Sequence, residues 1–241
     1  MILNGTLPTF IYLYIPNDHT GSIQAPNANQ FTNTALEEVA DGDVALGMVV
    51  QHIMQSPIYY EYDTDSGSAL FATYDDAQSS LDHIHPHRTP MIVISPFAKP
   101  GYIATRHYST ASIVKTEELL MGLPPNNLGD LLATDLRDMF QSNYNGITAG
   151  QIQFEPKVQY KPTEEGKRVW ALASQLDSSA PDRDSRRLGA LARLSATADD
   201  LHNAAEKANR LGTPEYKKQQ EVVYQDALEV VNTAVARDSD D

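Results

Sequence analysis

The sequence contains no cysteine among its 241 residues. It therefore has neither a disulfide framework nor a thiolate metal site, and any metal ion must be held by oxygen and imidazole ligands. Such ligands suit a divalent metal ion such as zinc, manganese, calcium or magnesium. Basic residues are scarce as well, because 18 lysines and arginines face 32 acidic residues and leave a formal net charge of −14. This balance argues against nucleic acid as a partner, since proteins that bind the phosphate backbone carry basic stripes.

Long apolar runs and several common enzyme motifs are also missing. No apolar run approaches the ~20 residues of a membrane span, and the first nine residues lack the basic start and apolar segment of a signal peptide. We therefore expect no membrane partner and, by default, a cytoplasmic location. The sequence has no glycine-rich phosphate loop, no G-x-S-x-G elbow and no H-E-x-x-H motif, which disfavours the enzyme classes that depend on them.

Between residues 10 and 140, short β-branched or aromatic runs alternate with longer helical stretches. This alternation is typical of a mixed sheet with crossover helices and predicts the α/β class. The expected strands are Phe10–Ile15, Leu70–Thr73 and Met91–Ser95. Apolar periodicity predicts one helix over Leu36–Met54 and another over Ile113–Met121, the second ended by Gly122 and a pair of prolines.

The pattern changes after Phe140, where the turn-rich segment 142–146 leads into polar and then helical sequence. Apolar residues recur at three- and four-residue spacing from Leu188 to Ala208, and a second amphipathic stretch runs from Glu215 to Val235. We expect two antiparallel helices there. The predicted domains are an α/β domain over residues 1–145 and a linker with a helical region over residues 146–241.

Two polar clusters follow expected strands. The segment ATYDDAQSSLDHIHPHR, residues 72–88, combines three carboxylates, three imidazoles and an arginine, and a smaller Asn-Asp-His-Thr cluster follows the first strand. Ligands in open α/β sheets bind at the carboxyl ends of strands, so we expect both clusters to contribute to one site. The predicted metal ligands are Asp18, His19, Asp75, Asp76, His83 and His87.

Each of these signals has an ordinary structural alternative. Two adjacent aspartates also serve as a turn or helix cap. The His-Ile-His-Pro-His run also suits a solvated loop. We expect one or two of its three histidines to be ligands and one to be a supporting or structural residue. Arg88 either holds a phosphate oxygen or pairs with Asp82.

Histidines and hydroxyl groups elsewhere have two readings as well. His107, Tyr108 and Ser109 precede the second helix and either approach a substrate or cap that helix. We expect His52 and His202, both within helical stretches, to be structural.

Four segments carry a resemblance to a known family, and they read in order LPTFIYLYIPNDHTGS, DGDVALGMVVQHIMQSPIYY, ATYDDAQSSLDHIHPHRTPMIVISPFAKPGY and HYSTASIVKTEELLMGLPP. From about Leu7 to Phe140 the chain resembles the C-terminal half of bacterial phosphoesterases of the alkaline phosphatase superfamily, in the branch often fused to a YncE-like β-propeller. The resemblance implies an alkaline-phosphatase-like α/β sandwich with a mostly parallel sheet, here partial because the N-terminal half is missing, followed by an α-helical C-terminal extension.

The resemblance also implies roles for residues of this chain. Asp75 and Asp76 resemble the paired metal ligands after a central strand, Asp18 with His19 resemble the other contributors, and one histidine of the 83–87 run resembles the last ligand. Three features depart from the family: Tyr74 stands for the usual glutamate, Ser80-Leu81 for a glycine-containing turn, and His85 for a common aspartate. The catalytic nucleophile belongs to the N-terminal half in this superfamily, so no residue is assigned to it.

Two functions follow. The first is metal-dependent hydrolysis of a small-molecule phosphate ester, either by this chain in its own right or with the missing half supplied by a neighbouring chain. The second is a catalytically inactive remnant or protein-interaction module that binds a partner through its acidic surface and C-terminal helices. We expect cation binding with little hydrolysis by the isolated chain, because an attacking hydroxyl must be positioned for turnover. We also expect an exposed sheet edge that invites self-association or a partner chain.

Overall fold

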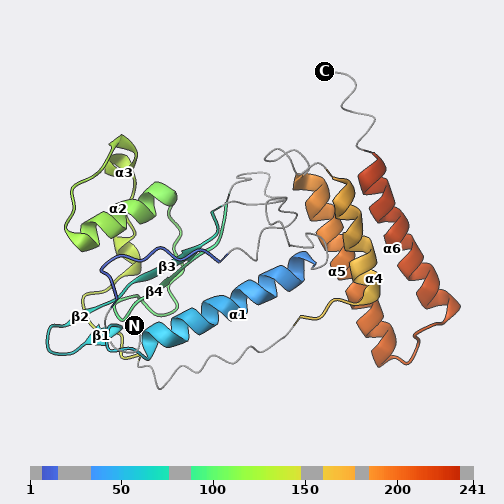
Figure 1. The fold of residues 1–241 in the computed structure, drawn as a ribbon, viewed down its shortest axis with the longest axis horizontal. Helices are drawn as coiled ribbons and strands as arrows, with labels where there is room; N and C mark the ends of the chain where they lie inside the picture. Colours follow the sequence, from blue (N-terminus) through green and yellow to red (C-terminus); the bar gives the residue numbers. More distant parts are fainter. Residues whose placement is uncertain (1–6, 16–33, 76–87, 148–159, 177–184, 234–241) are drawn as a thin grey trace. The chain divides into compact units, whose positions relative to one another are not determined.

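The computed structural model describes residues 7–15, 34–75, 88–147, 160–176 and 185–233 (Figure 1). Contacts within the chain divide it into two units. Among the described residues, the first unit comprises 7–11, 48–74 and 90–147, and the second comprises 12–15, 34–47, 75, 88–89, 160–176 and 185–233.

Helix α1 (Ala35–Met54) confirms the helix predicted over Leu36–Met54. A reciprocal capping box begins it: the Glu37 N–H donates to Thr34 Oγ1 at 3.3 Å, and the Thr34 N–H donates to Glu37 Oε2 at 3.2 Å. These two bonds satisfy backbone donors that the first turn leaves without helical partners. His52 contacts the Met48 carbonyl oxygen one turn earlier, with Nδ1 at 2.7 Å, which agrees with the structural role expected for it.

The strands form two antiparallel pairs, β1 (Tyr60–Glu61) with β2 (Ser66–Gly67), and β3 (Leu70–Thr73) with β4 (Met91–Ile94). The predicted strands at 70–73 and 91–95 are thus confirmed. A mostly parallel sheet is not found among the described residues. Register pairs Leu70 with Ile94 and Thr73 with Met91, so the chain leaves β3 and re-enters β4 at the same end, whereas parallel neighbours need a crossover to the opposite end.

The strand predicted over Phe10–Ile15 is wrong. Residues 10–15 adopt no strand, and the side chains of residues 10–14 are each more than half exposed, up to 78% for Tyr12. An apolar run becomes a strand only when a neighbouring strand completes its hydrogen-bond ladder, and no described strand pairs with this run. The β3–β4 pair therefore stays two-stranded in the described part of the chain, and association through its outer edges stays a prediction.

Helix α2 (Thr110–Met121) confirms the second predicted helix and its stop. Gly122 follows it with φ of +69°, in the left-handed region that glycine adopts without strain. The Leu123 N–H then donates to the Glu118 carbonyl oxygen at 2.8 Å. Helix α3 (Leu128–Leu132) and the 3₁₀ helix η3 (Arg137–Met139) complete the first unit, and Leu136 between them is fully buried.

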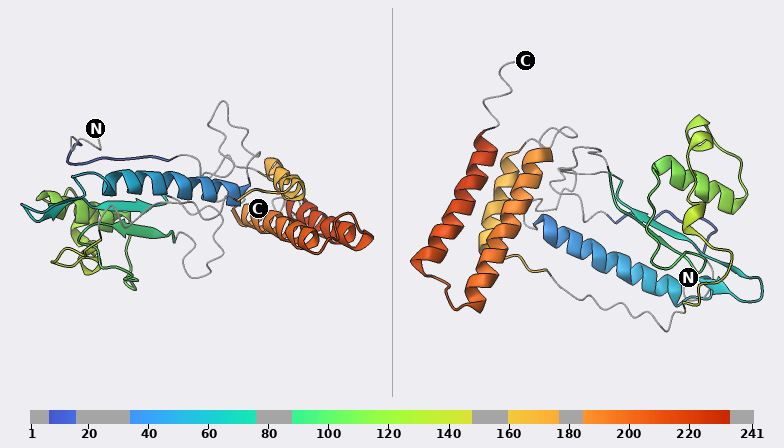
Figure 2. Two further views of the ribbon diagram at one scale, coloured as in Figure 1. Left: turned by 90° about the horizontal axis from the view of Figure 1, so that it is seen from below. Right: turned by 180° about the vertical axis from the view of Figure 1, so that it is seen from behind.

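The second unit holds a small helical bundle of α4 (Glu164–Trp170), the 3₁₀ helix η5 (Ala171–Gln175), α5 (Ser185–Lys207) and α6 (Pro214–Asn232). The predicted antiparallel pair is confirmed as α5 and α6, which lie side by side (Figures 1 and 2). Trp170 lies at the centre and is fully buried. The buried core consists of Val169, Trp170, Leu172, Ala173, Leu191, Ala198, Val223, Ala227 and Val231. In the described ranges, every helix is too short or too polar to cross a membrane.

Candidate functional site

One end of the β3–β4 pair carries both ends of the predicted metal-binding segment. Asp75 follows β3 after a single residue, and Arg88 precedes β4 by two residues. The Thr73 hydroxyl donates to the Pro90 carbonyl oxygen at 3.0 Å and joins the two strands at this end. Asp75 and Arg88 are both exposed. An exposed aspartate and an exposed arginine therefore stand at the two ends of one connection.

The other predicted ligands lie outside the described residues: Asp18, His19, Asp76, His83 and His87. Their convergence with Asp75 stays a prediction, as does the role of His85. Within the described ranges, no group of three or more histidine, aspartate or glutamate side chains gathers in a way that could hold a metal ion. The predicted set of three aspartates and three histidines nonetheless has the donor chemistry of a divalent cation site, because it offers only oxygen and imidazole ligands.

A hydrogen-bonded cluster centred on Asp138 shows which role Tyr108 has. The Tyr108 hydroxyl donates to Asp138 Oδ1 at 2.5 Å, and the Tyr102 hydroxyl donates to Oδ2 at 2.9 Å. Arg106 Nε lies 3.9 Å from the same Oδ2, and Lys99 Nζ donates to the Asp138 carbonyl oxygen at 2.7 Å. The cluster ties the loop before α2 to η3. Tyr108 thus has a structural role, because its hydroxyl group links these two segments.

The protonation states of this cluster follow from burial and from these bonds. Burial raises the pKa of the Tyr108 hydroxyl, and the bond to Asp138 raises it further. Burial alone would raise the pKa of Asp138, but the hydroxyl groups of Tyr108 and Tyr102 outweigh it and hold that pKa below its ordinary value. The tyrosines therefore keep their protons at neutral pH and do not supply a phenolate nucleophile or base.

Sequence spacing gave no signal for this cluster, since Tyr108 and Asp138 are 30 residues apart. Ser109 takes the capping role that the sequence left open. It is the N-cap residue of α2 in extended conformation, and its N–H donates to Ser112 Oγ at 3.1 Å. Ser109 therefore has a structural role at the start of α2.

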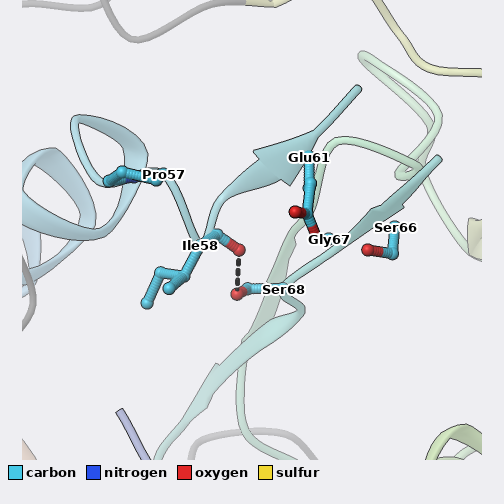
Figure 3. A pocket seen from close by; sticks show the side chains of 6 residues that line it. All are labelled: Pro57, Ile58, Glu61, Ser66, Gly67 and Ser68. Atoms are coloured by element: carbon cyan, nitrogen blue, oxygen red, sulfur yellow. Dashed lines mark hydrogen bonds between the residues drawn. The ribbon is translucent and has the colours of Figure 1, made fainter. Parts of the chain in front are cut away.

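A pocket of about 300 Å³ opens beside the β1–β2 pair (Figure 3). Its lining residues are Pro57, Ile58, Glu61, Ser66, Gly67 and Ser68. The Ser68 hydroxyl donates to the Ile58 carbonyl oxygen at 2.6 Å, so it is already occupied. A Cβ on Gly67 would lie 2.5 Å from Pro96 Cγ, which makes this glycine a packing requirement. None of the predicted site residues lines the pocket, and a single carboxylate beside bonded hydroxyls supplies no catalytic pair.

A comparison with protein-family models identifies the chain. The model described as the Phosphoesterase family matches residues 2–124, just over half of the sequence, and the chain belongs to that family. Separate searches of curated proteins and of solved structures found no match. The matched range contains the β3–β4 pair and every predicted site residue from Asp18 to Arg88, and it ends before the helical bundle. Membership indicates phosphoester hydrolysis as the class of activity.

Proposed function

We propose that the chain acts in metal-dependent hydrolysis of phosphate esters of the kind carried out by the alkaline phosphatase superfamily. One observation carries the proposal: the family match spans all the candidate residues, and within it Asp75 and Arg88 stand at the two ends of one connection at one end of the β3–β4 pair. A carboxylate for a cation and a guanidinium for a phosphate are complementary halves of a phosphoester site.

The proposed roles divide between cation and substrate. The residues that would hold a divalent cation are Asp18, His19, Asp75, Asp76, His83 and His87. A bound cation supplies polarisation of a phosphoryl oxygen or a water of lowered pKa. Arg88 would hold a phosphate oxygen through two parallel N–H donors, a geometry that lysine lacks. The substrate proposed is a small-molecule phosphate ester.

We assign no nucleophile to this chain. Tyr108 retains its proton, and Ser109 begins α2, so neither hydroxyl group next to α2 is prepared for attack. Positioning of the attacking group supplies a large part of the rate of such reactions. The isolated chain is therefore expected to bind a cation and to hydrolyse a generic aryl phosphate slowly, and a partner chain that supplies the nucleophile would complete the site.

Calorimetry with zinc and manganese on the full chain tests the proposal. The variant Asp75→Ala plus Asp76→Ala is expected to lose cation binding. The matched control is Asp41→Ala plus Asp43→Ala, which removes two exposed carboxylates of α1 and should bind like the wild type. Equal binding by the two double variants would refute the metal site.

Hydrolysis of p-nitrophenyl phosphate by the same proteins tests whether the chain supplies its own nucleophile. We expect turnover close to the background rate for all three proteins when zinc or manganese is present. Robust turnover that only the Asp75 and Asp76 changes abolish would show that the chain is a complete enzyme with its own nucleophile. That result would overturn the partner part of the proposal and retain the metal part.

A further inference from the structure

Thr73 joins the two strands at the end of the β3–β4 pair where the candidate site segment begins. Its hydroxyl group donates to the Pro90 carbonyl oxygen at 3.0 Å, and the two residues are 17 positions apart in the chain. The same hydroxyl oxygen lies 3.1 Å from the carbonyl oxygen of its neighbour Tyr74, so its one proton is shared between two acceptors. Thr73 is exposed. Its side chain thus contributes a bond between the strands rather than buried apolar area.

The backbone ladder ends just before this bond. The last two residues in register are Thr73 of β3 and Met91 of β4. The next residue on the second strand is Pro90, which has no N–H and cannot donate to a further pair. Its carbonyl oxygen still accepts, and the hydroxyl group of Thr73 donates to it. A side chain therefore continues the pairing one residue beyond the end of the ladder.

Asp75 and Arg88 are equally far along the chain from this bond. Asp75 comes two residues after Thr73, and Arg88 comes two residues before Pro90. Two residues of chain span at most ~7 Å, and Thr89 is restricted to extended conformations because a proline follows it. The Thr73–Pro90 bond therefore limits how far the backbone at Asp75 can separate from the backbone at Arg88.

Other contacts hold the two strands in place independently of Thr73. The Phe71 ring of β3 packs edge to face with the Phe140 ring, with the centroids 6.3 Å apart. The Asn145 side-chain amide donates at 3.0 Å to the carbonyl oxygen of Ser95, the residue that follows β4. Loss of the Thr73 hydroxyl group is therefore expected to loosen the ends of the connection while the strand pair remains folded.

We propose that Thr73 is a positioning residue of the phosphoester site. Its hydroxyl group holds the backbone at Asp75 and Arg88 at a separation that lets a cation bound by Asp75 contact a phosphate oxygen bound by Arg88. This inference rests on the proposed function and adds to it a residue that touches neither ligand. Phosphate then strengthens cation binding, and the cation strengthens phosphate binding by the same factor. A threonine that only stabilised the strand pair would leave that factor unchanged.

The separation can be measured without any ligand. The chain has no cysteine, so nitroxide labels on Asp75→Cys plus Arg88→Cys occupy only those two positions. Pulsed electron paramagnetic resonance is expected to give one narrow distance distribution with Thr73 or Thr73→Ser. Thr73→Val lacks the hydroxyl group but suits a strand, and should broaden the distribution and shift it to longer distances. The control Thr197→Val removes an exposed hydroxyl group that donates to the Arg193 carbonyl oxygen at 2.9 Å in α5, and should have no effect.

Calorimetry with manganese, with and without phenylphosphonate, measures the coupling in chains that keep Asp75 and Arg88. We expect phenylphosphonate to tighten manganese binding about fivefold or more in the wild type and in Thr73→Ser. Thr73→Val should lose most of this gain and keep its affinity for manganese alone. An equal gain in the wild type and Thr73→Val overturns the inference, and so does a label distance distribution that Thr73→Val leaves unchanged. Absence of manganese binding by the wild type would instead overturn the proposed function and the positioning role with it, so the two failures are distinguishable.

Discussion

The carboxylate of Asp199 lies in the space beside Gly166 where any other residue would place its Cβ, which would come 2.6 Å from Asp199 Cγ. Asp199 belongs to α5, and it accepts the N–H of Thr163 at 2.7 Å, the Thr163 hydroxyl at 2.6 Å and the hydroxyl of Tyr160. It thereby satisfies the first turn of α4 from a neighbouring helix. Glycine is unfavourable inside a helix, and this close approach is the reason that α4 contains one.

Replacing Gly166 with alanine is expected to destabilise the helical bundle by about 1–3 kcal/mol, because the added methyl group displaces Asp199 from the start of α4. Trp170 is the single tryptophan of the chain and is fully buried, so its fluorescence reports unfolding of this bundle in urea. Gly42→Ala provides the control. Its Cβ meets no described atom within 4 Å, and it should be neutral or stabilising by roughly 0.5–1 kcal/mol. Equal unfolding midpoints for the two variants would contradict the packing argument.

Leu191→Ala tests the core of the same bundle. Leu191 is fully buried in the cluster around Trp170, and truncation removes apolar contacts and leaves a cavity. We expect a loss of about 2–5 kcal/mol in the free energy of unfolding, measured by tryptophan fluorescence in urea. Leu211 is 43% exposed and serves as the matched control, with an expected change within roughly 0.5 kcal/mol for Leu211→Ala. A small effect at both positions would show that the core is not closely packed.

A third prediction concerns the cluster that joins α4, α5 and α6. The Tyr216 hydroxyl donates to Glu165 Oε1 at 2.8 Å, and His202 Nδ1 lies 2.9 Å from the Tyr216 oxygen and 3.1 Å from Glu165 Oε2. Since the tyrosine proton points to Glu165, His202 Nδ1 must carry a proton of its own. The structure thus gives His202 the structural role expected from the sequence.

Burial and the bond to Glu165 raise the pKa of Tyr216 to about 12. Burial alone would raise the pKa of Glu165, but the Tyr216 hydroxyl and neighbouring groups outweigh it and lower that pKa. The stabilisation from Glu165 is therefore present above its ordinary pKa and is lost as the pH falls through the lowered value.

Tyr216→Phe is expected to cost about 1 kcal/mol at pH 7, with the difference from the wild type shrinking in acid. Urea unfolding followed by tryptophan fluorescence between pH 3 and pH 7 measures both effects. Tyr224→Phe leaves the ring beneath Arg168, 3.6 Å from the guanidinium carbon, and should match the wild type throughout. A Tyr216→Phe deficit that stays constant across this pH range would exclude the linkage to Glu165.

The long helices were predicted correctly, because apolar periodicity and helix-end residues depend only on neighbouring positions in the sequence. The ends of α2 and α6 carry their own markers, Gly122 after the first and Thr213 with Pro214 at the start of the second. Helical sequence was expected after the polar segment, but the bounds of helix α4 were not predicted, because its glycine is unfavourable until Asp199, distant in sequence, accounts for it. The strand prediction for Phe10–Ile15 failed for a related reason, since strand formation depends on a pairing partner.

In the candidate site, too, features set by neighbouring residues were predicted and contacts between distant residues were not. The sequence correctly placed Asp75 just after a strand, because short β-branched and aromatic runs bounded by polar residues mark strands locally. The direction of β3 against β4 was not predictable, since pairing of strands depends on residues at 70–73 and 91–94 meeting in space. The Asp138 cluster was missed because hydrogen bonds between distant residues leave no periodic pattern.

The final prediction concerns the buried acids at the α2–α3 junction. Burial and the charge of Asp130 raise the pKa of Glu118. Burial alone would raise the pKa of Asp130 too, but the N–H groups of Asn127, Asn126 and Leu131 outweigh it and hold that pKa below its ordinary value. The two acids therefore differ in charge: Asp130 is the negatively charged member of the pair, and Glu118 retains its proton to higher pH.

Because the folded state holds the Glu118 proton more tightly than the unfolded chain, the stability contributed by Glu118 is complete below its ordinary pKa and is lost as the pH rises through the raised value. Glu118→Gln keeps the shape of the protonated acid and does not titrate. We therefore expect the variant to match the wild type near pH 4 and to become progressively more stable than it toward pH 8. Thermal unfolding followed by near-ultraviolet circular dichroism of the stacked Tyr60 and Tyr144 rings, whose centroids lie 4.1 Å apart, reports on this unit. Asp63→Asn, at an exposed position of the same unit, is the control for loss of a carboxylate. A stability difference between Glu118→Gln and the wild type that is the same at both pH values would refute the retained proton.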